Sequence, residues 1–227
     1  MKFFLQRTFA ILVIGSVFIF NGCSNFSTSK ISEGVIEYVI TYPVKSPMDG
    51  MGPTSMSFKF KDDKTYGEIS AGMGIFVISF IADSEKKTLL QTLKLMGKKF
   101  AYFSDTSEIK KILDEEPKMI IEKVAGEKMI ANYKCKRAMV KFEDTTLTPF
   151  EVYYTSDIGI KSSNWCNPFR VLDGVLMEYN LKRYNIEMHF TAKSVSEVKV
   201  DDEIFELGDD FKKISRKEMD EMFENFN

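Results

Sequence analysis

Apolar and polar residues alternate along most of this chain, which is the pattern of half-buried β-strands. Residues 55–61 show it most clearly, because Met56, Phe58 and Phe60 fall on one face while serine and lysine fall on the other. Asp62 and Asp63 follow directly and predict a turn. The same pattern predicts strands over residues 35–42, 55–61, 65–69, 75–81, 87–96, 100–103, 118–124, 135–142, 150–154, 175–184 and 186–193.

Helical spacing interrupts this alternation after residue 104. Asp105 is a suitable N-cap, Ile109 and Leu113 then repeat at helical spacing, and Pro117 ends the helix. A third short helix, besides this one and the C-terminal helix described next, is compatible with the pattern near residues 168–172.

The C-terminal segment predicts an amphipathic helix. Ser215 and Glu218 form a capping box, and an apolar stripe follows at helical spacing. This stripe consists of Met219, Met222, Phe223 and Phe226.

About ten strands in hairpin succession with two or three helices predict a mainly β (α+β) fold. We expect a single curved antiparallel sheet or half-barrel, forming one domain over residues 32–227.

The N-terminus is organised like a bacterial lipoprotein signal. Lys2 and Arg7 form a positive region before an apolar run over residues 8–20, which is shorter than the roughly 20 residues that a membrane-spanning helix needs. Gly22 and Cys23 come next and resemble a lipobox, although the two residues before them depart from its commonest pattern. We therefore predict a signal peptide over residues 1–22 and lipidation of Cys23. An ordinary signal peptide followed by a chance cysteine is the alternative.

Acyl chains on Cys23 would make the membrane a permanent partner, since each methylene buried in the bilayer contributes about 0.8 kcal/mol to the free energy of membrane binding. Residues 23–31 are polar after this cysteine and predict a flexible tether. Ser24 replaces the aspartate that retains many lipoproteins in an inner membrane. We expect an envelope protein anchored in the outer membrane and facing the periplasm.

Charge and composition narrow the possible partners. The chain carries a formal charge of −2, which becomes −4 once Lys2 and Arg7 are removed with the signal peptide. Nucleic acid is not expected as a partner, because its binding needs a concentrated basic surface. Phenylalanine, tyrosine and methionine are abundant, with 20, 9 and 13 copies, and these large side chains favour apolar binding surfaces.

Candidate catalytic chemistry is sparse. The only histidine, His189, falls on the polar face of its strand together with Glu187 and Thr191. No Gly-x-Ser-x-Gly elbow supplies a nucleophile for it. We predict no catalytic residue and favour a solvated histidine.

The cysteines allow two interpretations. Cys135 and Cys166 would lie in an oxidising compartment, where they could form a disulfide or remain two separate buried thiols. With His189 they make three widely separated ligands, whereas a structural zinc site takes four close ones. We therefore expect neither a metal nor a cofactor. Residues 47–53 (PMDGMGP) present methionines on a flexible loop, either as an adaptable binding surface or as packing at the edge of the core.

Several segments resemble a known group of proteins. Residues 131–138 (ANYKCKRA) are similar to the Gly-Tyr-x-Cys-x-x-Ala run of uncharacterised envelope lipoproteins, with Asn132 in place of glycine. Residues 153–158 and 172–178 resemble their W-Y-T-x-E-I and G-L-P-G-L-I-L-E segments, with Asp173 in place of proline. The chain thus resembles a lipoprotein family of unknown function related to the GLPGLI-motif group, and this resemblance implies no activity.

The expected sheet also loosely resembles the lipoprotein-localisation carriers, which hold acyl chains in an apolar half-barrel. The sequence thus predicts a non-enzymatic envelope lipoprotein that binds an apolar or amphiphilic ligand in the concave face of its sheet. A structural or assembly factor that contacts envelope proteins is the alternative.

Overall fold

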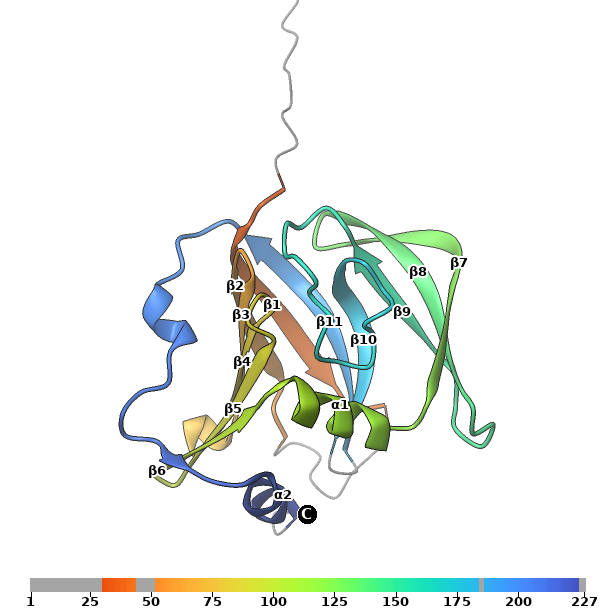
Figure 1. Cartoon of the computed structure of the whole chain (residues 1–227). Coiled ribbons are helices and arrows are strands. Elements are labelled where there is room, and N and C mark those ends of the chain that lie inside the picture. Colours follow the sequence, from red (N-terminus) through yellow and green to blue (C-terminus); the bar gives the residue numbers. More distant parts are fainter. Residues whose placement is uncertain (1–29, 44–51, 184–185, 225–227) are drawn as a thin grey trace, which may run out of the picture.

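The computed structural model describes residues 30–43, 52–183 and 186–224. It confirms a mainly β fold, in which one mixed, largely antiparallel sheet is accompanied by two α-helices (Figure 1). The sheet has twelve strands rather than about ten, in the order β12-β6-β5-β4-β3-β2-β1-β11-β10-β9-β8-β7. The strands are β1 Glu33–Thr41, β2 Ser55–Lys61, β3 Lys64–Ala71, β4 Phe76–Asp83, β5 Thr88–Leu95, β6 Lys98–Ser104, β7 Met119–Ile130, β8 Tyr133–Phe142, β9 Phe150–Thr155, β10 Val175–Arg183, β11 Ile186–Ser196 and β12 Lys212–Lys213.

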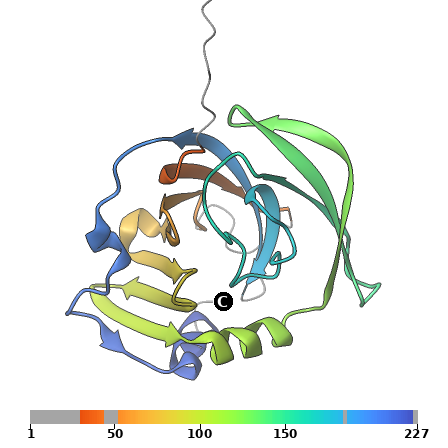
Figure 2. The same ribbon diagram turned by 45° about the horizontal axis from the view of Figure 1, so that its top comes forward.

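The sheet curls into an incomplete ring (Figure 2). Hairpins build the run from β2 to β6 and the run from β7 to β9, and the antiparallel pair β1–β11 lies between them. Helix α1 (Thr106–Glu115) follows β6 and precedes β7, so it bridges the open side of the ring. Asp105 caps this helix as predicted, because its carboxylate accepts hydrogen bonds from the backbone N–H groups of Ser107 and Glu108, each at 2.9 Å.

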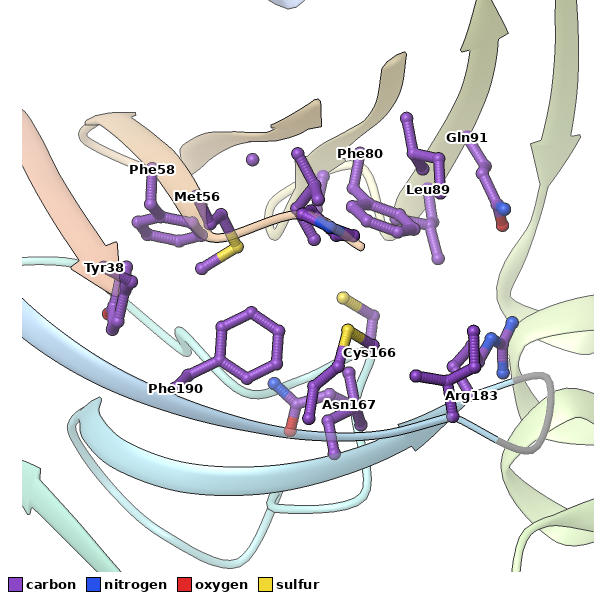
Figure 3. A pocket seen from close by; sticks show the side chains of 18 of the residues that line it. Tyr38, Met56, Phe58, Phe80, Leu89, Gln91, Cys166, Asn167, Arg183 and Phe190 are labelled. Atoms are coloured by element: carbon purple, nitrogen blue, oxygen red, sulfur yellow. The ribbon is translucent and has the colours of Figure 1, made fainter. Parts of the chain in front are cut away.

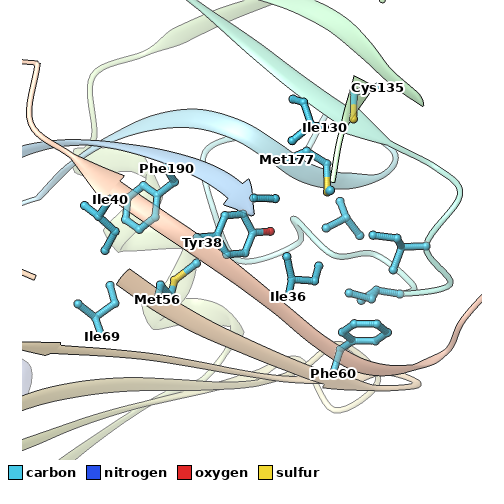
Figure 4. Packing of buried hydrophobic residues seen from close by; sticks show 14 residues of the cluster. Ile36, Tyr38, Ile40, Met56, Phe60, Ile69, Ile130, Cys135, Met177 and Phe190 are labelled. Carbon is cyan, nitrogen blue, oxygen red and sulfur yellow. The ribbon is translucent and has the colours of Figure 1, made fainter. Parts of the chain in front are cut away.

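The largest buried cluster lies on the inner face where β1, β2, β10 and β11 meet (Figure 4). The side chains of Ile36, Phe60 and Phe190 are almost completely buried there. Tyr38 joins this cluster and donates a hydrogen bond of 2.7 Å to the carbonyl oxygen of Leu176. Alternation thus directs the large apolar side chains inward, as the sequence predicted.

Residues 156–174 join β9 to β10 and lie inside the ring; we name this segment the inner loop (Figure 2). Phe169 and Leu172 of the loop are buried against β8 and β9. Turns occupy the place of the third helix predicted near residues 168–172, so that prediction is wrong. Gly174 ends the loop at φ +148°, where a Cβ atom would lie 2.5 Å from the carbonyl oxygen of Thr155. Only glycine fits this close approach.

The chain after β11 crosses the outer face of the sheet. Its 3₁₀-helix η2 (Asp202–Phe205) places Phe205 against Ile81 and Val200. The short strand β12 then pairs with β6 in parallel, which adds the twelfth strand. Another 3₁₀-helix, η1 (Gly72–Gly74), lies between β3 and β4.

Helix α2 (Arg216–Glu224) confirms the predicted C-terminal helix and its capping box. The backbone N–H of Ser215 donates to the carboxylate of Glu218 at 2.8 Å, and the N–H of Glu218 donates to the hydroxyl of Ser215 at 3.3 Å. Met219 and Phe223 pack against the inner face of β5 and β6, while Phe226 lies outside the described residues.

The predicted signal peptide and Cys23 also lie outside the described residues, as does most of the tether over residues 23–31. Within residues 30–43, 52–183 and 186–224, no helix has the length and apolar character needed to cross a bilayer.

Candidate functional site

A cavity of about 510 Å³ lies between the inner faces of the two sides of the ring (Figure 3). Strands β2 to β5 form one wall, and β10, β11 and the inner loop form the opposite wall. We name it the inner cavity. Its walls are predominantly apolar, and the side chains that Figure 3 shows around it include Tyr38, Met56, Phe58, Phe80, Leu89 and Phe190.

The inner cavity exists because small residues occupy inward positions between large ones. Gly67 pairs across the sheet with Phe58 on one side and Phe80 on the other. A Cβ atom at position 67 would lie 3.6 Å from the ring of Phe58 and 3.9 Å from that of Phe80, which is ordinary van der Waals contact. Thr65 and Ala82 are further short side chains in this wall. The strands therefore leave space that their own side chains do not fill.

Most polar groups around the inner cavity are satisfied by the protein itself. Asn164 donates from its side-chain amide to the carbonyl oxygens of Leu172 and Gly174, at 2.9 and 2.8 Å. Tyr42 donates to the carbonyl oxygen of Pro53 at 2.7 Å. These bonds fix the cavity walls and leave little polar surface for a ligand.

Gln91 differs from these groups. It lies on β5, lines the inner cavity and is 7% exposed. Among the residues that the structure describes, none is hydrogen-bonded to its side-chain amide. Buried polar groups are hydrogen-bonded in most proteins, so this amide is available to a molecule inside the cavity.

Two charged residues belong to the described lining of the inner cavity, and they neutralise each other. Arg183 ends β10, and Glu116 follows helix α1. The guanidinium of Arg183 donates to the carboxylate of Glu116 at 3.0 Å. The lining therefore presents no net charge to a ligand.

Cys135 and Cys166, for which the sequence left a disulfide or two separate thiols open, are free thiols in the structure. Cys135 is buried in the cluster of Figure 4, whereas Cys166 lies on the inner loop and lines the inner cavity. Burial raises the pKa of each thiol to about 11. Both therefore stay protonated and weakly nucleophilic at neutral pH.

His189 lies on the outer face of β11, away from the inner cavity. Its Nδ1 atom is 2.6 Å from the side-chain oxygen of Asn180, and its Nε2 atom is 3.9 Å from the carboxylate of Glu178. In the part of the chain that the structure describes, no three His, Cys, Asp or Glu residues gather in a metal-binding group. Of the methionine-rich segment 47–53, only Gly52 and Pro53 are described, and both line the cavity.

The sequence analysis missed the residues that shape this cavity. Gly67 stands where alternation calls for a large inward side chain, and Gln91 stands at an inward position in the apolar segment TLLQTLKL. Each breaks the pattern of its strand, which is a signal that the sequence contains. The two residues belong to one cavity only because hairpins bring β3 and β5 to either side of β4.

Comparison with known proteins identifies the fold and no family. No protein-family model matches the chain, and a search of curated proteins gives no significant match. The solved structure of PNGF-II in the P21 space group has a TM-score of 0.55 and 15% identity over 85% of this chain. This chain spans 33% of that protein's length. A β-barrel-like protein of the domain of unknown function DUF1849 from Brucella abortus has a TM-score of 0.34 and 8% identity, covering 75% of this chain and 99% of that one.

Proposed function

We propose that this protein is a non-enzymatic lipoprotein of the cell envelope that binds an apolar or amphiphilic molecule in the inner cavity. The single observation that carries the proposal is this cavity of about 510 Å³ with its predominantly apolar lining. Protein interiors are close-packed and rarely retain large voids. Pockets for small molecules typically measure about 300–1,000 Å³. A space of this size inside an otherwise packed sheet is therefore expected to hold a ligand.

The anchor in this proposal is Cys23. Its acyl chains would hold the protein on the outer membrane, facing the periplasm, on the tether of residues 23–31. Segments 131–138 and 172–178 support membership of the GLPGLI-related lipoproteins. The curled sheet supports the analogy with lipoprotein-localisation carriers, which is an analogy of fold alone. Metabolic acyl labelling tests the anchor: the parent should be labelled and Cys23→Ala should not, and a labelled Cys23→Ala protein would refute it.

The binding proposal is tested by filling the inner cavity. Gly67→Leu should extend its added atoms into the cavity, because a Cβ atom at this position meets Phe58 and Phe80 only at ordinary van der Waals distances. Ser70→Leu is the matched control, since it adds a leucine to the exposed side of the same strand. Both changes are made in the Cys23→Ala protein, which would carry no acyl chains of its own.

The measurement is titration with N-phenylnaphthylamine, whose fluorescence rises in an apolar site. We expect saturable binding to the parent and to Ser70→Leu, and at least tenfold weaker binding to Gly67→Leu. Far-ultraviolet circular dichroism and a melting curve establish that all three proteins are folded. If folded Gly67→Leu bound the probe as tightly as the parent, the inner cavity would not be the binding site.

A second candidate function is that of an assembly factor, and an exposed apolar rim favours it. Ile75 and Met96 line the inner cavity but are 54% and 74% exposed, so they lie at its opening. The neighbouring Met73 is fully exposed. Exposed apolar patches often mark protein contacts. A cross-linked envelope protein that is lost in Met73→Lys and Met96→Lys, with probe binding unchanged, would favour this candidate.

A further inference from the structure

Gln91 is a buried polar side chain on the wall of the inner cavity. Gln91 faces inward from the middle of β5, in register with Phe80 on β4 and Tyr102 on β6. Its side chain is more than nine-tenths buried, and it is directed into the cavity (Figure 3). Among the described residues it has no hydrogen-bond partner. Its amide borders the space of the cavity, so a bound molecule can form the hydrogen bonds that the described residues do not supply.

The charges around the cavity restrict what that molecule can present. Arg183 and Glu116 are the two charged residues of the described lining, and their side chains pair at 3.0 Å. An ionised head group that moves from water to Gln91 would lose its hydration and find no unpaired counter-charge in the described lining, which disfavours its binding. An uncharged group meets no such penalty. The primary amide of Gln91 can donate and accept at once, which matches a hydroxyl or an amide.

We propose that the ligand of the inner cavity is an amphiphile with an apolar chain and an uncharged hydrogen-bonding group, an alcohol or amide, that binds Gln91. This inference rests on the proposed function, because it names the class of molecule that the cavity takes. The apolar chain lies against the phenylalanine-lined wall. The polar group forms a donor–acceptor pair with the side chain of Gln91.

The test compares matched ten-carbon competitors that displace N-phenylnaphthylamine: decanol, decanamide and decanoate. The variant is Gln91→Leu in the full-length Cys23→Ala protein, and its control is Thr92→Val, which removes a polar group from the outer face of the same strand. Gln91→Leu should fold with an unchanged or higher melting temperature, because it removes a polar side chain to which no described residue is hydrogen-bonded.

In the parent, we expect decanol and decanamide to displace the probe at lower concentrations than decanoate. Gln91→Leu should weaken the binding of decanol and of decanamide about two- to tenfold, as the loss of one hydrogen bond predicts. It should leave decanoate and the probe itself unchanged. Thr92→Val should behave as the parent throughout.

The failures of the two proposals are distinguishable. If the probe binds the parent, but decanol and decanamide displace it from Gln91→Leu as well as they displace it from the parent, the role of Gln91 is refuted. The cavity then remains a binding site. Preferential binding of decanoate to the parent would likewise refute the uncharged head group. If the probe does not bind the parent at all, the proposed function fails, and the inference about Gln91 fails with it.

Discussion

The inner faces of β8–β9 and of β3–β4 belong to one sheet but are covered in different ways. Against β8 and β9, the inner loop buries Phe169 and Leu172 among Val140, Val152 and their neighbours. Against β3 and β4, small residues such as Gly67 and Ala82 face a cavity of about 510 Å³. We call these regions the filled half and the open half of the inner face.

The difference shows that the open half is not simply a consequence of sheet curvature. The chain covers the filled half with a nineteen-residue connection, residues 156–174, that turns inward instead of running along the surface. The same loop extends to the cavity, where Cys166 and Asn167 contribute to the opposite wall. The filled half therefore supplies stability and a fixed wall, and the open half supplies the space.

The largest expected effect is a difference between the two halves in the free energy of unfolding that is lost when a phenylalanine is truncated. Phe169 is 1% exposed and packs against the rings of Phe150 and Tyr179, with centroids 6.4 and 5.9 Å away. Phe169→Ala should cost about 3–5 kcal/mol in the free energy of unfolding. Phe80→Ala is the matched change in the open half, and it should cost clearly less because Phe80 already borders empty space. Urea unfolding measures both, and equal losses would contradict the distinction between the halves.

A smaller effect is expected where the inner loop is tied in place. Asn164→Ala removes the donor for the carbonyl oxygens of Leu172 and Gly174, which should cost about 1–3 kcal/mol. Ser163→Ala is the control, because its hydroxyl donates to Gly174 alone, at 2.8 Å. Limited proteolysis should then cut Asn164→Ala within residues 156–174 faster than it cuts Ser163→Ala. Identical cleavage rates would show that Asn164 does not hold the loop.

The two free cysteines should differ in how fast they react with an alkylating reagent. Cys166 lines the cavity and Cys135 is sealed in a packed cluster, so alkylation of the folded Cys23→Ala protein should modify Cys166 first. N-phenylnaphthylamine should slow that reaction, and single-cysteine variants identify the modified site. The denatured, unreduced protein should titrate two thiols. A count of zero would instead establish the disulfide between Cys135 and Cys166.

The last expected effect is the pH dependence that these thiols contribute. Burial raises the pKa of each from 9.0 to about 11, so the folded protein favours the protonated form. Their contribution to stability is therefore complete below pH 9 and is lost as the pH rises from 9 to about 11. The free energy of unfolding should fall over this range, and less so in Cys166→Ala. An equal fall in that variant would assign the effect to other groups.

Local patterns predicted the local structure well. The alternation of residues 55–61 matches β2, and Asp105 and the Ser215–Glu218 box cap helices α1 and α2. These features depend on residues that are close together in the chain. The segment near residues 168–172 failed, because contacts of Phe169 and Leu172 with distant strands override the local preference.

The cavity could not be predicted in the same way. It depends on the pairing of β1 with β11, in which Val35 lies opposite Ser196, and no local pattern specifies such a distant partner. Gly67 and Gln91 were visible as exceptions in their strands. That both face one cavity became evident only from the order of the strands.

The most direct test of the account is to identify what the protein holds when it is isolated. The full-length Cys23→Ala protein, expressed in its own envelope and purified without detergent, should be studied by native mass spectrometry followed by solvent extraction. We predict one non-covalently bound uncharged amphiphile per chain in this protein and in Ser70→Leu, and its loss in Gly67→Leu. An empty parent protein, or equal recovery from folded Gly67→Leu, would contradict the claim that the inner cavity is a binding site.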